Sequence, residues 1–170
     1  MRRSMAFGFS AAALSLRRMM LCMLGLWLTG LALQVQALTL ELRQAQATVT
    51  VQGYTTRQTV GLPYHWDRQH VGRRGEAIFE IPFELKEPPG ELMGLYIPRL
   101  GNAYEVWLNG TLLQQNGDLQ NYNGADYAKA PRYIEISPGL LSNNNLFRIH
   151  IRSDIGRRGG LAPMTLGPHD

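Results

Sequence analysis

The stretch LYIPRLGNAYEVWLNGTLL, residues 95–113, contains two β-type runs joined by PRLGN. The second run alternates, with Tyr104, Val106 and Leu108 on one face and Glu105 and Trp107 on the other. This period of two indicates a strand with one buried face. The Asn-Gly pair that follows, immediately before TLL, predicts a tight type I′ hairpin turn. We therefore expect the rest of the domain to form strands that cover this hairpin.

The same alternation recurs further along the chain. Residues 77–85 (AIFEIPFEL) place all their large apolar side chains except one on a single face, and residues 146–151 (LFRIHI) alternate in the same way. Shorter strand-like runs occupy residues 38–42, 47–51, 92–97, 132–136 and 161–166. Residues 38–170 contain no pattern typical of an amphipathic helix of three turns, so the sequence predicts an all-β fold, an antiparallel β-sandwich.

Residues 1–37 differ from the rest of the chain. Arg17 and Arg18 precede an uncharged run at residues 19–33, and Val35-Gln36-Ala37 supplies the small residues that a signal peptidase reads. Because the run is shorter than the about 20 apolar residues of a membrane span, we expect a cleaved signal peptide, with an uncleaved signal-anchor helix as the alternative. The predicted organisation is this segment at 1–37 and an exported β-sandwich domain at 38–170.

The net charge of +4 belongs entirely to the predicted leader, which holds four arginines and no acidic residue. Of the 17 Lys and Arg in the chain, 13 remain after these four, and they balance the 13 Asp and Glu. A neutral domain gives no reason to expect nucleic-acid binding. The one cysteine, Cys22, also lies in the leader, so we expect no disulfide in the domain.

We find no catalytic motif with a specific spacing. The domain has no cysteine nucleophile, no GxSxG and no phosphate-binding glycine loop. His65 and His70 flank Asp67, but zinc usually takes a third protein ligand, and no HxxxH helix is present. We predict no metal, no cofactor and no enzymatic activity. An enzyme is the weakest hypothesis, and turnover that is lost on replacing His65 or Asp67 would revive it.

Aromatic and charged side chains gather on several predicted loops. A flat ring beside planar hydrogen-bonding groups suits a sugar, a carboxylate or a small polar ring. The candidate ligand-binding residues are His65, Trp66, Asp67, Arg99, Asn102, Tyr104, Lys129, Arg132, Tyr133, Arg157 and Arg158. The alternative is structural: Trp66 and Tyr104 would be core residues, and the arginines would pair with Asp67, Asp118 or Asp154.

Several of these runs also resemble a known family. PRLGNAYEVWLNGTLL, with LPYHWDRQHVGRRG before it and YAKAPRYIEISPGLL after it, resembles the periplasmic sensor domains of bacterial membrane signalling proteins. The VWLNG hairpin is similar to that of galactose-binding-like jelly rolls, including the sugar-binding domain of family 2 glycoside hydrolases. The resemblance covers roughly residues 62–168, and it implies a jelly-roll β-sandwich with a sensory or ligand-binding role.

We therefore expect a non-catalytic periplasmic ligand-binding domain, or one anchored in the inner membrane and facing the periplasm. Because the sequence ends soon after Leu166-Gly167-Pro168 with no second hydrophobic span and no GGDEF or kinase motif, we expect either an N-terminal fragment of a diguanylate cyclase or histidine kinase, which this ending favours, or a stand-alone periplasmic relative. The expected partners are a small-molecule or sugar ligand, or a periplasmic protein, and the membrane if the leader is uncleaved. The alternative is a carbohydrate-binding accessory module of a secreted glycoside hydrolase.

Overall fold

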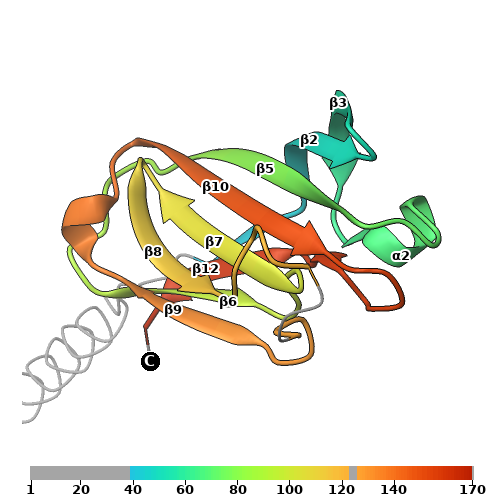
Figure 1. The fold of residues 1–170 in the computed structure, drawn as a ribbon. Coiled ribbons are helices and arrows are strands. Elements are labelled where there is room, and N and C mark those ends of the chain that lie inside the picture. The colour runs from blue at the N-terminus through green and yellow to red at the C-terminus, as the bar shows by residue number, and fades with distance from the viewer. Residues whose placement is uncertain (1–38, 123–125, 170) are drawn as a thin grey trace, which may run out of the picture. The chain divides into compact units, whose positions relative to one another are not determined.

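The computed structural model describes residues 39–122 and 126–169, and these residues form an antiparallel β-sandwich (Figure 1). The predicted signal peptide or signal-anchor helix at residues 1–37 lies outside the described residues. Residues 39–122 and 126–169 include no helical segment that could span a membrane. The prediction of an all-β, antiparallel sandwich is confirmed for the domain.

Two large sheets make up the described part of the sandwich. One has four strands in the order β1 (Leu40–Leu42), β12 (Met164–Pro168), β6 (Met93–Ile97) and β9 (Arg132–Ile136). The other has six, in the order β3 (Tyr54–Gly61), β2 (Gln44–Val51), β5 (Gly75–Glu84), β10 (Asn144–Ser153), β7 (Ala103–Leu108) and β8 (Thr111–Asn116). A third, two-stranded sheet pairs β11 (Gly160–Leu161) with β4 (Tyr64–His65), and the short helices are α2 (Trp66–Gln69) and the 3-10 helix η1 (Pro138–Leu140).

The hydrophobic core is built from the alternating faces of these strands. In β5, Phe79 and Ile81 are buried and Glu80 between them is partly exposed, as a strand with one solvent-facing side requires. Phe147 of β10 is fully buried, and its ring stacks on Phe83 with 5.0 Å between the ring centres. Leu95 of β6, in the other sheet, belongs to the same core. The predicted buried faces of residues 77–85, 104–108 and 146–151 are confirmed.

The hairpin at residues 104–113 folds as its sequence predicts. Asn109 (φ 50°) and Gly110 (φ 85°) both adopt the left-handed backbone conformation that a type I′ turn requires. β7 and β8 pair on either side of this turn, with Leu108 opposite Thr111. On its other edge β7 pairs with β10, so the hairpin lies at one side of the six-stranded sheet.

The strands β3 and β4 and the helix α2 were not predicted. β3 is exposed along nearly its whole length, so neither of its faces carries the apolar alternation that marks a half-buried strand. The segment from Leu62 to Asp67, which breaks the strand pattern in the sequence, forms β4 and then enters the single-turn helix α2. β4 pairs with β11 through His65 and Gly160, and this pairing brings His65 beside the connection between β10 and β11.

Candidate ligand-binding site

Three connections meet beside the small β4–β11 sheet. They link β6 to β7 (residues 98–102), β8 to β9 (residues 117–131) and β10 to β11 (residues 154–159). Backbone hydrogen bonds hold them together: Gly101 N–H donates to Gly160 O at 2.8 Å, and Ala162 N–H donates to Arg99 O at 2.9 Å. Tyr127 N–H donates to Asn102 O at 3.1 Å and joins the third connection to the first. The side chains of these connections are therefore positioned by main-chain contacts.

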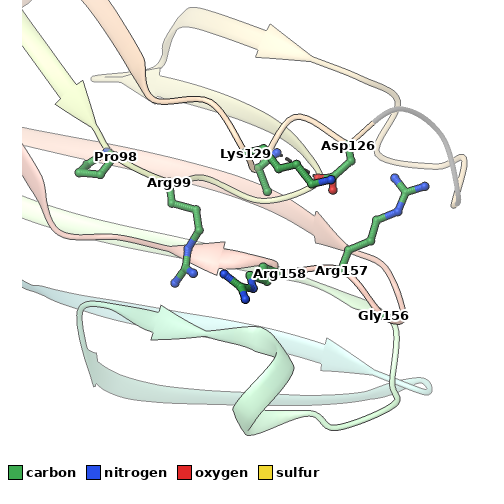
Figure 2. Close-up of a pocket in the computed structure, with 8 residues that line it drawn as sticks. Pro98, Arg99, Asp126, Lys129, Gly156, Arg157 and Arg158 are labelled. Carbon is green, nitrogen blue, oxygen red and sulfur yellow. Dashed lines mark hydrogen bonds between the residues drawn. The ribbon is translucent and has the colours of Figure 1, made fainter.

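A pocket of about 650 Å³ lies between the three connections (Figure 2). Its lining residues are Pro98, Arg99, Asp126, Ala128, Lys129, Gly156, Arg157 and Arg158. Figure 2 shows the side chains of Arg99 and Arg158 extending toward each other, while Arg157 extends away from that pair. Four basic side chains and one carboxylate give the described lining a strong positive excess, and the volume is in the range of small-ligand sites.

Arg99 is anchored by a neighbour outside the pocket lining. Its Nη2 donates a hydrogen bond to Nδ1 of His65 over 2.5 Å. Since a guanidinium has donors only, Nδ1 of His65 must be unprotonated in this arrangement. The Nε atom of Arg99 is buried and has no hydrogen-bond partner among the described residues. Arg99 therefore presents a guanidinium that is fixed on one side and has donor capacity remaining.

The electrostatic environment favours neutral His65. Burial lowers the pKa of His65, and the positive charges of Arg99 and Arg68 lower it further, while Asp67 acts in the opposite direction. These effects disfavour the imidazolium form, which would repel Arg99. The hydrogen bond between His65 and Arg99 is thus consistent with the direction of the pKa shift.

The carboxylate of Asp126 is also fixed by its neighbours. Its Oδ1 accepts hydrogen bonds from Nδ2 of Asn102 at 2.8 Å and from the backbone N–H of Ala128 at 3.1 Å. Asn102 is fully buried, and its Oδ1 accepts the backbone N–H of Asp154 at 2.8 Å. Asn102 is one of the predicted ligand-binding residues. The structure instead places it beneath the pocket, where it ties the three connections together.

A buried ion pair lies close to Arg157 of the pocket. Arg152 and Asp154 are each about 1% exposed in their side chains, and Nε of Arg152 lies 3.2 Å from Oδ1 of Asp154. Arg157 of the pocket lies 3.8 Å from the same carboxylate, measured from Nη1 to Oδ2. Arg152 also donates to the backbone carbonyls of Asp118 and Asn121. The pairing of arginines with Asp154, which the sequence left as an alternative, therefore occurs for Arg157.

Two predicted aromatic residues lie in the core. Trp66 is 1% exposed, and its Nε1 donates to Arg73 O at 2.8 Å. Tyr104 is fully buried, and its hydroxyl accepts from Nδ2 of Asn116 at 2.7 Å and contacts Oε1 of Gln114 at 3.2 Å. Both side chains use their polar atoms within the protein, as the structural alternative in the sequence analysis expected. Neither lines the pocket.

The remaining predicted residues lie outside the pocket lining. Arg132 donates to Tyr127 O at 2.8 Å, and its guanidinium lies 5.6 Å from the centre of the Tyr104 ring. Tyr133 is half-exposed on β9 and contacts the ring of His169 at 5.3 Å between centres. Asp67 is exposed on α2. We do not retain these three residues, Trp66, Asn102 or Tyr104 in the candidate site, which consists of the pocket lining together with His65.

Sequence reasoning missed Asp126. It lies in a segment whose Asn, Gly and Asp content indicates a polar loop. The one feature of the sequence that points to Asp126 is its position three residues before Lys129, a predicted ligand-binding residue. A carboxylate among four basic side chains changes the chemistry of the pocket, because it adds a fixed acceptor to a set of donors. The arrangement can bind an anion through arginine and lysine, and it can also accept a hydrogen bond from the ligand.

Comparison with solved structures shows which fold this domain has. A family 2 β-galacturonidase from Eisenbergiella tayi bound to galacturonate superposes with a TM-score of 0.57 and 16% sequence identity, over 79% of this chain and 25% of that one. A β-glucuronidase from Faecalibacterium prausnitzii gives a TM-score of 0.56 and 12% identity, over 79% of this chain and 32% of that one. The TM-scores establish a shared fold, consistent with a galactose-binding-like β-sandwich. The match covers only about a quarter to a third of the length of each enzyme. Neither a family model nor a curated protein sequence matches the chain.

Proposed function

We propose that this chain is a non-catalytic ligand-binding module that takes a small anionic molecule in the pocket between Arg99, Lys129, Arg157 and Arg158, and that it serves as the periplasmic sensory domain of a membrane signalling protein. The observation that carries the binding function is that these four basic residues, from three separate connections, line one pocket. Arginine binds carboxylates and phosphates through two parallel hydrogen bonds, so such a set is suited to an acidic ligand.

The sensory role draws its support from two features of the sequence. The uncharged run at residues 19–33 behind Arg17 and Arg18 is typical of export. The runs around VWLNG resemble periplasmic sensor domains. A ligand that bridges three connections would change their mutual packing, and this is the kind of signal that such a domain passes on. The gene sequence beyond codon 170 tests this role: a membrane span followed by an output domain is expected, and a secreted hydrolase sequence would contradict it.

Thermal unfolding of the 170-residue chain with and without small acids tests the binding function. A ligand at 100 times its dissociation constant stabilises by about 2.7 kcal/mol, which is about 5–10 °C in the melting temperature of a chain of this size. We expect D-glucuronate, phosphate or citrate to produce such a shift. Arg158→Gln should remove it, while the control Arg43→Gln, an exposed arginine paired with Glu41, should retain it. Absence of a shift with every acid, or an unchanged shift in Arg158→Gln, would exclude the proposed pocket.

A carbohydrate-binding accessory module of a secreted glycoside hydrolase is the second candidate. It is favoured by the fold shared with a β-galacturonidase and a β-glucuronidase. An accessory module holds a polymer, so it would be retained on an immobilised acidic polysaccharide such as pectate. A sensory domain that encloses a small ligand would be eluted from that column yet bind the free monosaccharide acid. Retention on pectate that Arg158→Gln abolishes would therefore favour the second candidate.

A further inference from the structure

The pocket contains one group that a simple anion site would not include. Asp126 lines it together with Lys129 and three arginines, and its negative charge weakens the binding of any anion nearby. The Asp126 carboxylate is fixed in position, because its Oδ1 accepts hydrogen bonds from the side chain of Asn102 and from the backbone N–H of Ala128. Asn102 is itself buried and held by Asp154. The fold thus fixes a hydrogen-bond acceptor in a pocket where an acceptor does not help to bind an anion.

A fixed carboxylate requires a hydrogen-bond donor on the ligand. Both of its hydrogen bonds to described residues go to Oδ1, so Oδ2 is the oxygen that we assign to a ligand. An ionised carboxylate accepts hydrogen bonds and donates none. A ligand with oxygens that only accept, such as a simple carboxylate, leaves Asp126 desolvated and without a donor, which is costly. A ligand with a hydroxyl or an ammonium group satisfies it through a charge-assisted hydrogen bond.

The surrounding charge decides between these two donors. An amino acid would place its ammonium at Asp126, but Lys129 lines the same pocket and repels a second cation. The described lining carries four basic groups and one acid, so a zwitterion would leave most of the positive charge uncompensated. A hydroxyl group is uncharged, so Lys129 does not repel it. A ligand with a net negative charge also lowers the positive excess of the pocket lining.

We propose that the ligand is a hydroxylated carboxylic acid, of the size of a monosaccharide acid, whose carboxylate is bound by Arg99 and Arg158 and whose hydroxyl donates to Oδ2 of Asp126. The inference rests on the proposed function, since it specifies the ligand of that same pocket. Asp126 is then a specificity residue: it selects hydroxylated acids over plain acids, and the basic side chains supply the attraction common to both.

Calorimetric titration of the 170-residue chain with five ligands built on a six-membered ring tests the inference. These are a uronate (D-glucuronate and D-galacturonate in separate runs), cyclohexanecarboxylate without hydroxyls, glucose without the acid, and the zwitterion 4-aminocyclohexanecarboxylate. We expect the better uronate to bind at least about tenfold more tightly than cyclohexanecarboxylate, equivalent to about 1.4 kcal/mol. Glucose and the zwitterion should bind more weakly than the uronate.

Asp126→Asn is the diagnostic variant. Asparagine retains an oxygen for the hydrogen bonds from Asn102 and Ala128, but it removes the charge and replaces Oδ2 by an amide nitrogen. The preference for uronate over cyclohexanecarboxylate should fall by about tenfold, partly because the plain acid now binds more tightly. Glu135→Gln, at an exposed position of β9, is the matched control and should leave the preference unchanged.

The outcomes separate this inference from the proposed function. If both acids bind equally to the parent chain, or if Asp126→Asn leaves the preference intact, the assignment of a hydroxylated ligand is wrong while the anion pocket stands. Tighter binding of the zwitterion than of the uronate would also overturn it. If neither acid binds, or if Arg158→Gln binds both as well as the parent does, the proposed function itself fails.

Discussion

At the scale of single residues, the position of Arg99 depends on the protonation of His65. Arg99 donates to Nδ1 of His65, and that acceptor exists only while the ring nitrogen is unprotonated. The pKa of His65 is lowered, first by burial and then by Arg99 and Arg68. Nearby, burial and then Arg73 lower the pKa of His70, whose Nε2 is 2.7 Å from the hydroxyl of Tyr64. Both shifts therefore disfavour the charged form of the histidine ring.

These shifts predict a loss of stability in mild acid. Both histidines have a pKa of 6.5 when unfolded and a lower one when folded, so their contribution is fully present above pH 6.5. It is lost as the pH falls below 6.5 toward the folded pKa values, because the unfolded chain then binds more protons. Urea unfolding at several pH values should show this decline. His65→Asn keeps an acceptor for Arg99 without a titrating ring, and it should decline less; an equal decline in the variant would refute the role of His65.

The sequence indicated part of the site because charge is easily recognised and burial is not. Arg99, Lys129, Arg157 and Arg158 were selected as charged residues on loops, and the fold brings all four to one pocket. Trp66 was selected for its ring, yet a tryptophan has the same sequence signature in a binding site and in a core. Only the packing of α2 against the strands distinguishes the two cases.

At the scale of elements, strands with one buried face could be predicted and exposed ones could not. In β10, Phe147, Ile149 and Ile151 are fully buried and alternate with partly exposed residues, so the period of two is visible in the sequence. β3 pairs with β2 over its whole length, but its side chains remain exposed. Its position comes from backbone hydrogen bonds, which leave no hydrophobic pattern.

Two neighbouring substitutions in β10 test the assignment of its faces. Phe147→Ala should lower the free energy of unfolding by about 3–5 kcal/mol, because it leaves a cavity against Phe83 in the core. Leu146 is the neighbouring residue on the opposite face of the strand, and its side chain is 39% exposed. Leu146→Ala should therefore lower the free energy of unfolding by about 1 kcal/mol or less. Urea unfolding measures both. Similar losses for the two variants would contradict the register of the strand.

A substitution at Gly160 tests the pairing of β4 with β11. Its φ of 122° is strained for other residues, and a Cβ atom placed there would lie 1.9 Å from the carbonyl oxygen of Tyr64. Gly160→Ala should therefore destabilise the fold by about 1–3 kcal/mol. It should also weaken ligand binding, since the pairing of Gly160 with His65 positions His65, and His65 in turn positions Arg99. Gly139→Ala, with open space around its Cβ position, should change stability by less than about 0.5 kcal/mol. Equal behaviour of the two variants would refute this role of Gly160.

At the scale of the whole domain, the two large sheets act as a rigid support for loops that carry the chemistry. The strands contribute the core, while the pocket is built from connections that are far apart in sequence and are joined by backbone hydrogen bonds. This separation explains why the sequence predicts the sandwich better than the site: strand patterns are local, whereas the meeting of three connections depends on strand order. Asp126 could not be recognised before that order was known.

The central claim, that this pocket binds a small acid, is tested most directly by NMR titration of the ¹⁵N-labelled 170-residue chain with D-glucuronate. We predict saturable shifts of the amide signals of Arg99, Lys129 and residues 156–158, with little change along β3. Saturable shifts centred instead on the exposed face of the six-stranded sheet around Trp107, or no saturable shift at all, would contradict the account.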